Sequence, residues 1–348
     1  MKKLLYLFLT VLIVACSDDD GNPCLYNPTL TTSAVTNITE TSATLNGVIS
    51  IVSENCDDPN NTEQGFVYAT NIQPTIANTK VNVNGTEVTT TLENLEPNTT
   101  YYVRTFLTNA LGEFYGNEVS FMTTEEPVNC DGNPIPSIVY ETQEWTVENA
   151  CHITYRDGTP IPEVTDGTAW QNLTTGAWSY YDNDSTKPRL YNWYAVMGIH
   201  DNNPNTPNKE FAPEGWHVPS NAEWTTLKEH LIANGFNYDG TTTGNKIAKS
   251  MASTTGWNSS TEPGAPGNDQ SLNNDSGFNA PPEGFRSQRD NFPGFFGGEG
   301  LITYFWSSTP ILNTSTAWFY ALEYTTSILI STNDNNKWVG FSVRFVRD

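Results

Sequence analysis

The stretch GWHVPSNAEW, residues 215–224, places a histidine and a glutamate between two tryptophans, a combination that acid–base and metal sites use. Ser220 and Glu223 also have the spacing of a capping box, in which each side chain accepts a hydrogen bond from the other residue's backbone at a helix start. His217 has no second histidine or cysteine at a ligand spacing. We therefore expect His217 to be packed and hydrogen-bonded, and the stretch to serve as a scaffold.

Two helices are predicted around this stretch. After the capping box, Trp224, Leu227 and Leu231 recur at i, i+3 and i+7, and Gly235 is placed to end the helix. A second amphipathic helix is predicted in LYNWYAVMGI, where apolar residues stand at helical spacing: Leu190, Trp193, Tyr194 and Met197. These apolar side chains are expected in the core.

The segment Thr254–Gly300 is rich in Gly, Pro, Asn and Asp, and is too long for a mere connection. Long loops on rigid scaffolds often bind ligands. Oxygen ligands that calcium prefers are present there, namely Glu262, Asp269, Asn274 and Asp275. Aromatic side chains that can stack on sugars lie in or next to this segment: Trp257, Phe292, Phe295, Phe296 and Tyr304. We take Trp257, Asp269, Asp275, Phe295 and Tyr304 as candidate ligand-binding residues; the alternative is that the aromatic side chains pin the loop to its own domain.

Catalytic and metal motifs are otherwise absent from the sequence. It contains no HExxH, Walker or GxSxG pattern, and many acidic residues prevent the choice of a glycosidase pair. His200 and Asp201, in the loop HDNNPNTPN, form an exposed pair that offers a metal contact. We expect no enzyme and no resident cofactor, with calcium as the alternative.

The N-terminus has the features of a secretory signal. Two lysines precede an apolar run that is too short to span a membrane. The run ends in IVAC, which resembles a bacterial lipobox and implies cleavage after residue 15 and lipidation of Cys16. The acidic segment SDDDG that follows resembles the surface-export signal of Bacteroidetes-type lipoproteins. We expect a signal peptide at 1–15, an acidic tether at 16–26, and a surface-exposed lipoprotein held in the outer membrane by its lipid.

Charge and cysteine content restrict the partners further. The chain has 16 basic and 39 acidic residues, a net charge of −23, so we expect no binding of nucleic acid. Four cysteines besides Cys16 lie in an exported chain, where disulfides are favoured. Three pairings are possible, and we favour Cys24 with Cys56 and Cys130 with Cys151, because each pair lies within one module.

Two modules differ in composition. All ten tryptophans fall between Trp145 and Trp338, and the boundary lies in the Pro- and Gly-containing segment 123–134. Before it, short alternating segments predict an antiparallel sandwich. The stretch LENLEPNTTYYVRTFLTNALGEFYG resembles the fibronectin type III pattern, in which Tyr101 forms a tyrosine corner. We assign residues 27–125 to this all-β module.

The second module is predicted to be α+β, because two helices precede aromatic, β-branched segments near the C-terminus. Its ordered segments LYNWYAV, APEGWHVPSNAEWTTL, GFNAPPEGFR, YFWSST and GFSVRFVRD resemble the Fibrobacter succinogenes major paralogous domain. The resemblance covers about residues 131–348 and implies a fold akin to C-type lectins and formylglycine-generating enzymes, and we assign residues 126–348 to this module. No cysteine follows Cys151, so the resemblance does not extend to formylglycine chemistry.

A binding function is expected from these features together. The lectin-like module is predicted to bind polysaccharide or glycan, with the fibronectin type III module as a spacer and Cys16 as the anchor. The alternatives are a protein–protein adhesin or structural surface protein, and a glycan hydrolase.

Overall fold

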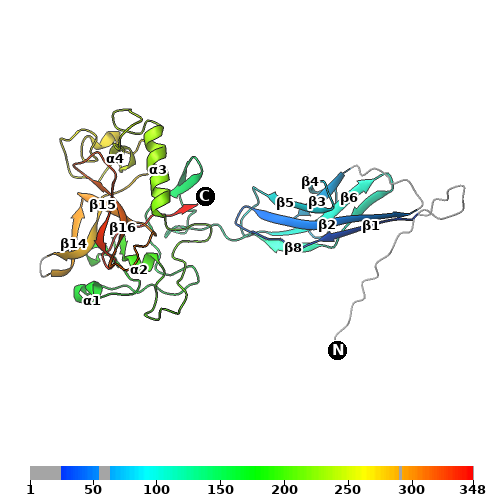
Figure 1. The fold of residues 1–348 in the computed structure, drawn as a ribbon, viewed down its shortest axis with the longest axis horizontal. Coiled ribbons are helices and arrows are strands. Elements are labelled where there is room, and N and C mark those ends of the chain that lie inside the picture. Colours follow the sequence, from blue (N-terminus) through cyan, green and yellow to red (C-terminus); the bar gives the residue numbers. More distant parts are fainter. Residues whose placement is uncertain (1–24, 55–62, 290–291, 348) are drawn as a thin grey trace, which may run out of the picture. The chain divides into compact units, whose positions relative to one another are not determined.

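The chain divides into two compact units, Met1–Glu126 and Pro127–Asp348, which are described separately (Figure 1). The structure is a computed structural model, and it describes residues 25–54, 63–289 and 292–347. The predictions for the signal peptide and for Cys16, Cys24 and Cys56 lie outside these residues. None of the described helices is long and apolar enough to cross a membrane.

The N-terminal unit is a sandwich of two antiparallel sheets. Its strands are β1 (Leu25–Thr32), β2 (Ala43–Glu54), β3 (Glu63–Ala69), β4 (Thr79–Asn82), β5 (Glu87–Leu92), β6 (Thr100–Asn109), β7 (Gly112–Tyr115) and β8 (Val119–Met122). One sheet has the order β1-β2-β5, and the other has the order β4-β3-β6-β7, with β8 also paired to β6. The strands alternate between inward apolar and outward polar residues, as the sequence predicted for a half-exposed sheet.

A buried core holds the two sheets together. Leu45 and Val88 from one sheet and Phe66 and Val103 from the other are fully buried in one cluster. The Tyr101 hydroxyl accepts a hydrogen bond from the Glu96 backbone N–H at 3.0 Å. This contact is the tyrosine corner that the fibronectin type III resemblance predicted.

The C-terminal unit mixes strands with short helices. Its strands are β9 (Ser137–Tyr140), β10 (Gln143–Thr146), β11 (Trp178–Tyr180), β12 (Arg189–Tyr191), β13 (Glu283–Arg289), β14 (Phe292–Glu299), β15 (Ile302–Trp306), β16 (Thr316–Glu323), β17 (Ile330–Asn336) and β18 (Val346–Arg347). Its helices are α1 (Gly167–Gln171), α2 (Trp193–Val196), α3 (Asn221–Ala233) and α4 (Ala248–Met251), with 3-10 turns η1 (Tyr181–Asn183) and η2 (Gln270–Leu272).

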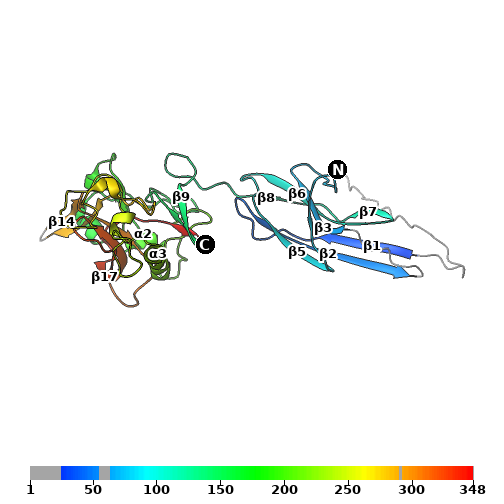
Figure 2. The ribbon, with the colours of Figure 1, turned by 90° about the horizontal axis from the view of Figure 1, so that it is seen from above.

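A central sheet of order β14-β13-β15-β16-β17 organises this unit. The β13–β15 pair is parallel and the other pairs are antiparallel. Two smaller sheets, β18-β10-β9 and β11-β12, complete the unit, and Figure 2 shows β9 near the C-terminal end of the chain.

The central sheet is buried on both faces. Phe305 and Tyr320 point into one core cluster, which contains Trp224 of α3, while their neighbours Trp306 and Phe319 point into another. The Trp224 and Tyr320 rings stack with centroids 4.6 Å apart, and Figure 1 shows α3 beside β15 and β16. The period-2 alternation of strand side chains therefore supplies two cores from one sheet.

Two predicted elements differ in the structure. The helix expected at residues 190–197 is instead strand β12 followed by the single turn α2, because Asn192 accepts a hydrogen bond from the Ala195 N–H and starts the helix only there. The expected loop Thr254–Gly300 contains strands β13 and β14, so its irregular part ends before Glu283.

Candidate functional site

The His217–Glu223 pair is part of the scaffold, as predicted. The Ser220 N–H donates to Glu223 Oε2 at 2.6 Å, and the Glu223 N–H donates to Ser220 Oγ at 3.3 Å, so the capping box is complete. His217 bonds the other carboxylate oxygen. Burial raises the pKa of Glu223, but hydrogen bonds from His217 and Ser220 outweigh it and leave that pKa below its ordinary value. The glutamate is therefore committed to the helix start.

The predicted aromatic platform does not form. Trp257 is only 4% exposed and lies in the cluster with α3, so its ring faces cannot stack on a sugar. Tyr304 of β15 packs against the other cluster, where its ring stacks on Phe341 with centroids 4.4 Å apart. The two side chains belong to cores on opposite faces of the sheet. Trp257 is therefore too buried to stack on a sugar, and Trp257 and Tyr304 do not share one ligand site.

The other three candidate residues lie apart as well. Phe295 of β14 is half-buried and packs edge-on against Phe285, with Arg289 over its ring. Asp269 is the cap of η2, where its carboxylate accepts a hydrogen bond from Ser271 at 2.6 Å. Asp275 is exposed. None of these five residues lines any of the pockets described below.

Lys249 of helix α4 extends its ammonium group into the irregular loop that begins at residue 254. The Lys249 ammonium donates to the Asn268 and Asp269 carbonyl oxygens and to Asn273 Oδ1, the latter two at 2.8 and 3.0 Å. Lys249 is 8% exposed. Among the described residues, no group of three His, Cys, Asp or Glu side chains is arranged to hold a metal ion. Loop oxygens thus surround an ammonium group belonging to the chain itself.

Cys130 and Cys151 form a disulfide with Cα atoms 6.0 Å apart, one of the two pairs favoured above. The disulfide lines a pocket of about 350 Å³, which is also lined by Glu283 and Arg344. Glu283 accepts hydrogen bonds from Asn149 at 2.6 Å and Ser342 at 2.7 Å. Burial raises the pKa of Glu283 more than these bonds and Arg344 lower it.

The loop 199–208 forms a polar site at the surface of this unit. Its ends meet where the Lys209 N–H donates to the Gly198 carbonyl at 2.9 Å. Gly198 has a φ of +67°, and a Cβ there would clash with the Lys209 backbone, so the closure requires glycine. The Gly176 N–H donates to the Ile199 carbonyl at 2.7 Å and ties the loop to the core. This closed, surface-lying segment is an Ω-loop.

Hydrogen bonds inside the loop fix its shape. Asn202 Oδ1 accepts from the Thr174 hydroxyl at 2.7 Å, and Asp201 Oδ1 accepts from the Asn203 N–H at 2.9 Å. Asn203 Oδ1 accepts from the Asn205 N–H at 3.1 Å. Among the described residues, the NH₂ groups of Asn202 and Asn203 have no acceptor in these bonds, so they remain available as donors.

These residues enclose a shallow pocket of about 300 Å³, which we call the loop pocket. It is lined by Thr174, Ile199, His200, Asp201, Asn202, Asn203, Pro204, Thr206 and Asn208. His200 packs edge-on against Tyr155, with ring centroids 6.4 Å apart, and its Nε2 lies 3.6 Å from Asp201 Oδ2. The hydrogen bond from the Asn203 N–H lowers the pKa of Asp201, which favours its charged form. Asp201 is the one carboxylate in the lining, which contains no lysine or arginine.

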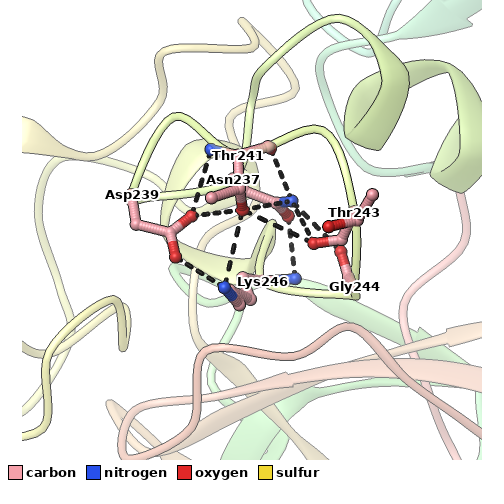
Figure 3. A network of polar contacts seen from close by, with 6 residues as sticks. All are labelled: Asn237, Asp239, Thr241, Thr243, Gly244 and Lys246. Atoms are coloured by element: carbon pink, nitrogen blue, oxygen red, sulfur yellow. Dashed lines mark hydrogen bonds and ion pairs between the residues drawn. The ribbon is translucent and has the colours of Figure 1, made fainter.

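A second polar cluster, in the turn after α3, is internally satisfied (Figure 3). The buried Asn237 amide donates to the carbonyl oxygens of Thr241, Thr243 and Gly244 at 2.7, 3.2 and 3.1 Å. Its oxygen accepts from the Lys246 N–H at 2.9 Å. The cluster thus holds the turn and is not a candidate binding site.

Comparison with known proteins identifies the C-terminal unit. Residues 138–347 match the Fibrobacter succinogenes major domain, which is more than half of the chain. The chain belongs to this family. The domain includes the central sheet, α3 and the loop pocket. No curated protein matches the chain.

Solved structures resemble only part of the chain. The sensor domain of the anti-sigma factor RsgI4 in Pseudobacteroides cellulosolvens is 17% identical over 32% of this chain and 89% of that chain, with a TM-score of 0.23. The fibronectin type III domain of human fibronectin type III domain containing protein 3 is 18% identical over 28% of this chain and 85% of that chain, with a TM-score of 0.20.

The sequence alone did not predict most of the loop pocket of the Fibrobacter domain. The cluster of asparagines in HDNNPNTPN was visible, but only the His200–Asp201 pair was considered there. Thr174 lies far upstream in the chain and reaches Asn202 only through the fold. No local pattern could have predicted that contact.

Proposed function

We propose that this chain is a non-catalytic, surface-exposed lipoprotein whose Fibrobacter succinogenes major domain binds a neutral polysaccharide or glycan in the loop pocket. The observation that supports it is the lining of amide and hydroxyl side chains on a loop whose backbone is closed and cross-bonded. A loop held in one conformation loses little entropy when a ligand binds.

The chemistry of the lining favours hydroxyl groups. Asn202, Asn203 and Asn208 present amides, and Asp201 presents a carboxylate that accepts from sugar hydroxyls. Lysine and arginine are absent from the lining, and the net charge of −23 repels acidic polymers. A neutral sugar is the class that fits both properties.

The remaining parts of the proposal concern the lipid anchor, the role of the sandwich and the fold of the C-terminal unit. Cys16 carries the lipid anchor in the outer membrane, the sandwich acts as a spacer, and the C-terminal unit has a C-type-lectin-like fold. Incorporation of labelled palmitate that is lost in Cys16→Ala tests the anchor. Digestion of intact cells with protease tests exposure at the surface.

A glycan array probed with the full mature chain tests the binding site. Double substitution of Asn202 and Asn208 by alanine should weaken binding at least about 10-fold, which corresponds to about 1.4 kcal/mol. Asn205→Ala is the matched control, because Asn205 belongs to the same loop but does not line the pocket. Equal binding by all three proteins would exclude the loop pocket, and loss of binding with a chelator would indicate calcium.

A protein–protein adhesin is the second candidate, and exposed apolar side chains favour it. Phe292, Leu272 and Leu312 are 72, 65 and 81% exposed. A folded chain that binds no glycan but captures a surface protein through these side chains would support this candidate. Release of sugar from a bound polysaccharide would show that the chain is a hydrolase.

A further inference from the structure

A pocket in the N-terminal sandwich has a neutral, aromatic lining. Its volume is about 560 Å³. Its lining residues are Tyr68, Ala69, Thr70, Asn71, Ala77, Asn78, Thr79 and Tyr101. No charged side chain lines it, although the chain as a whole carries 39 acidic residues. An uncharged ligand therefore fits this pocket.

The two tyrosines form the wall of the pocket. Their ring centroids lie 6.3 Å apart at an interplanar angle of 58°. The Tyr101 ring is held from behind by stacking on Phe121, and its hydroxyl is fixed by the Glu96 N–H. Tyr68 is half-buried at the end of β3, where it pairs with Thr79 of β4. Rigid aromatic walls of this kind offer contact area at low entropic cost.

A closed turn rich in amides and hydroxyls also lines the pocket. The Thr75 N–H donates to Asn78 Oδ1, and the Asn78 N–H donates to the Thr75 carbonyl, both at 2.9 Å. The Asn78 amide oxygen is therefore in use, and its NH₂ group has no acceptor among the described residues. Asn71, Thr70 and Thr79 are exposed beside it.

The Tyr68 hydroxyl adds a polar group on the aromatic side. Burial, and then the neighbouring Tyr101, raise the pKa of Tyr68, so its phenol stays neutral at physiological pH. Among the described residues this hydroxyl has no hydrogen-bonding partner. It can donate to one ligand hydroxyl and accept from another.

We propose that this sandwich pocket is a second binding site for a neutral oligosaccharide, in which a sugar ring stacks on Tyr68 and its hydroxyls bond Asn71 and Asn78. Aromatic faces contact the C–H groups of a pyranose while amides bind its hydroxyls. The proposal goes beyond the function proposed for the Fibrobacter domain and does not depend on it. A proline-rich peptide also docks on aromatic grooves, but the four amide and hydroxyl side chains of this pocket favour a sugar.

Titration of the full mature chain with cellohexaose, xylohexaose and mannohexaose tests the proposal, with decaproline as the competing ligand class. The Asn202→Ala, Asn208→Ala chain serves as background, so that binding at the loop pocket does not obscure the result. Tyr68→Ala should weaken the remaining sugar binding at least about 10-fold, about 1.4 kcal/mol. Tyr68→Phe should weaken it less, because the ring remains.

Asn71→Ala guards against a folding defect, because Asn71 is exposed and its loss leaves the sandwich core intact. It should reduce the same affinity several-fold. Sugar binding that none of these substitutions changes would overturn the proposal, and so would the absence of sugar binding in the background chain. Decaproline binding that depends on Tyr68, without sugar binding, would assign the pocket to a peptide instead. Each of these outcomes leaves the loop pocket to be judged from its own variants.

Discussion

Buried cationic side chains hold the irregular parts of the C-terminal unit through backbone carbonyl groups. Arg344 is fully buried and donates to the carbonyls of Thr146, Phe278 and Asn279. Arg286, also fully buried, donates to the Val164 and Thr165 carbonyls. Carbonyls in loops lack the partners that a helix or sheet supplies, and each buried one needs a donor. A guanidinium offers five donors, so a single side chain satisfies several.

Lys249 is the clearest case for a test, because a control lysine lies three residues earlier. Lys249→Met removes the donor to the buried Asn273 oxygen and to the part-buried Asn268 carbonyl, whereas the Asp269 carbonyl keeps its bond from the Leu272 N–H, so the free energy of unfolding should fall by about 1–3 kcal/mol. Lys246 pairs with Asp239 at the surface, where solvent screens the charges, so Lys246→Met should destabilise the fold much less than Lys249→Met. Urea unfolding followed by tryptophan fluorescence measures both, and equal effects would contradict this role for Lys249.

Glu283 should make stability depend on pH. Burial raises its pKa above the ordinary value of 4.5. A carboxyl whose pKa is raised in the folded state stabilises that state below the unfolded pKa, and this contribution is lost as the pH rises through the folded-state pKa. The glutamine side chain of the Glu283→Gln variant stays neutral at every pH. The free energy of unfolding of this variant, compared with that of the wild type, should therefore increase from acid toward neutral pH. Urea midpoints over that range measure the difference, and parallel pH profiles would disprove the effect.

At the scale of elements, helix α3 depends on its first turn. Ser220→Ala removes the acceptor of the Glu223 N–H and should lower the free energy of unfolding by about 1 kcal/mol. Thr226→Ala, in the exposed middle of the helix, is the matched control and should have little effect, because alanine favours helix. A chevron plot or equilibrium urea titration resolves this difference. No loss in Ser220→Ala would mean that water or His217 replaces the cap.

The elements that the sequence predicted correctly are those with local signals. Helix α3 combines a capping box, apolar spacing and a terminal glycine within one segment, and the structure contains all three. The helix predicted at 190–197 failed because pairing of β12 with β11 overrides the apolar spacing there. The candidate site failed for a related reason. Burial of Trp257 and the contact of Thr174 with Asn202 depend on residues far apart in the chain.

At the scale of the whole molecule, each unit contains its own hydrophobic core. The sandwich cluster consists of residues from the N-terminal unit alone, and the two clusters of the C-terminal unit flank its central sheet. With 39 acidic residues against 16 basic ones, and several of the basic ones turned inward, the surface is strongly acidic. This surface repels acidic ligands, and neither candidate pocket is lined by lysine or arginine, so neutral ligands suit both better than acidic ones.

Separate cores predict two unfolding transitions in calorimetry. Leu45 and Leu227 are both fully buried, one in each unit, and their substitution by alanine should cost about 2–5 kcal/mol. Leu45→Ala should lower the midpoint of one transition and Leu227→Ala that of the other, whereas a single shared transition would show that the units unfold together. A ligand raises the stability of the unit that binds it. A neutral oligosaccharide that raises only the Leu45-sensitive transition therefore binds the sandwich pocket, and one that raises only the Leu227-sensitive transition binds the loop pocket.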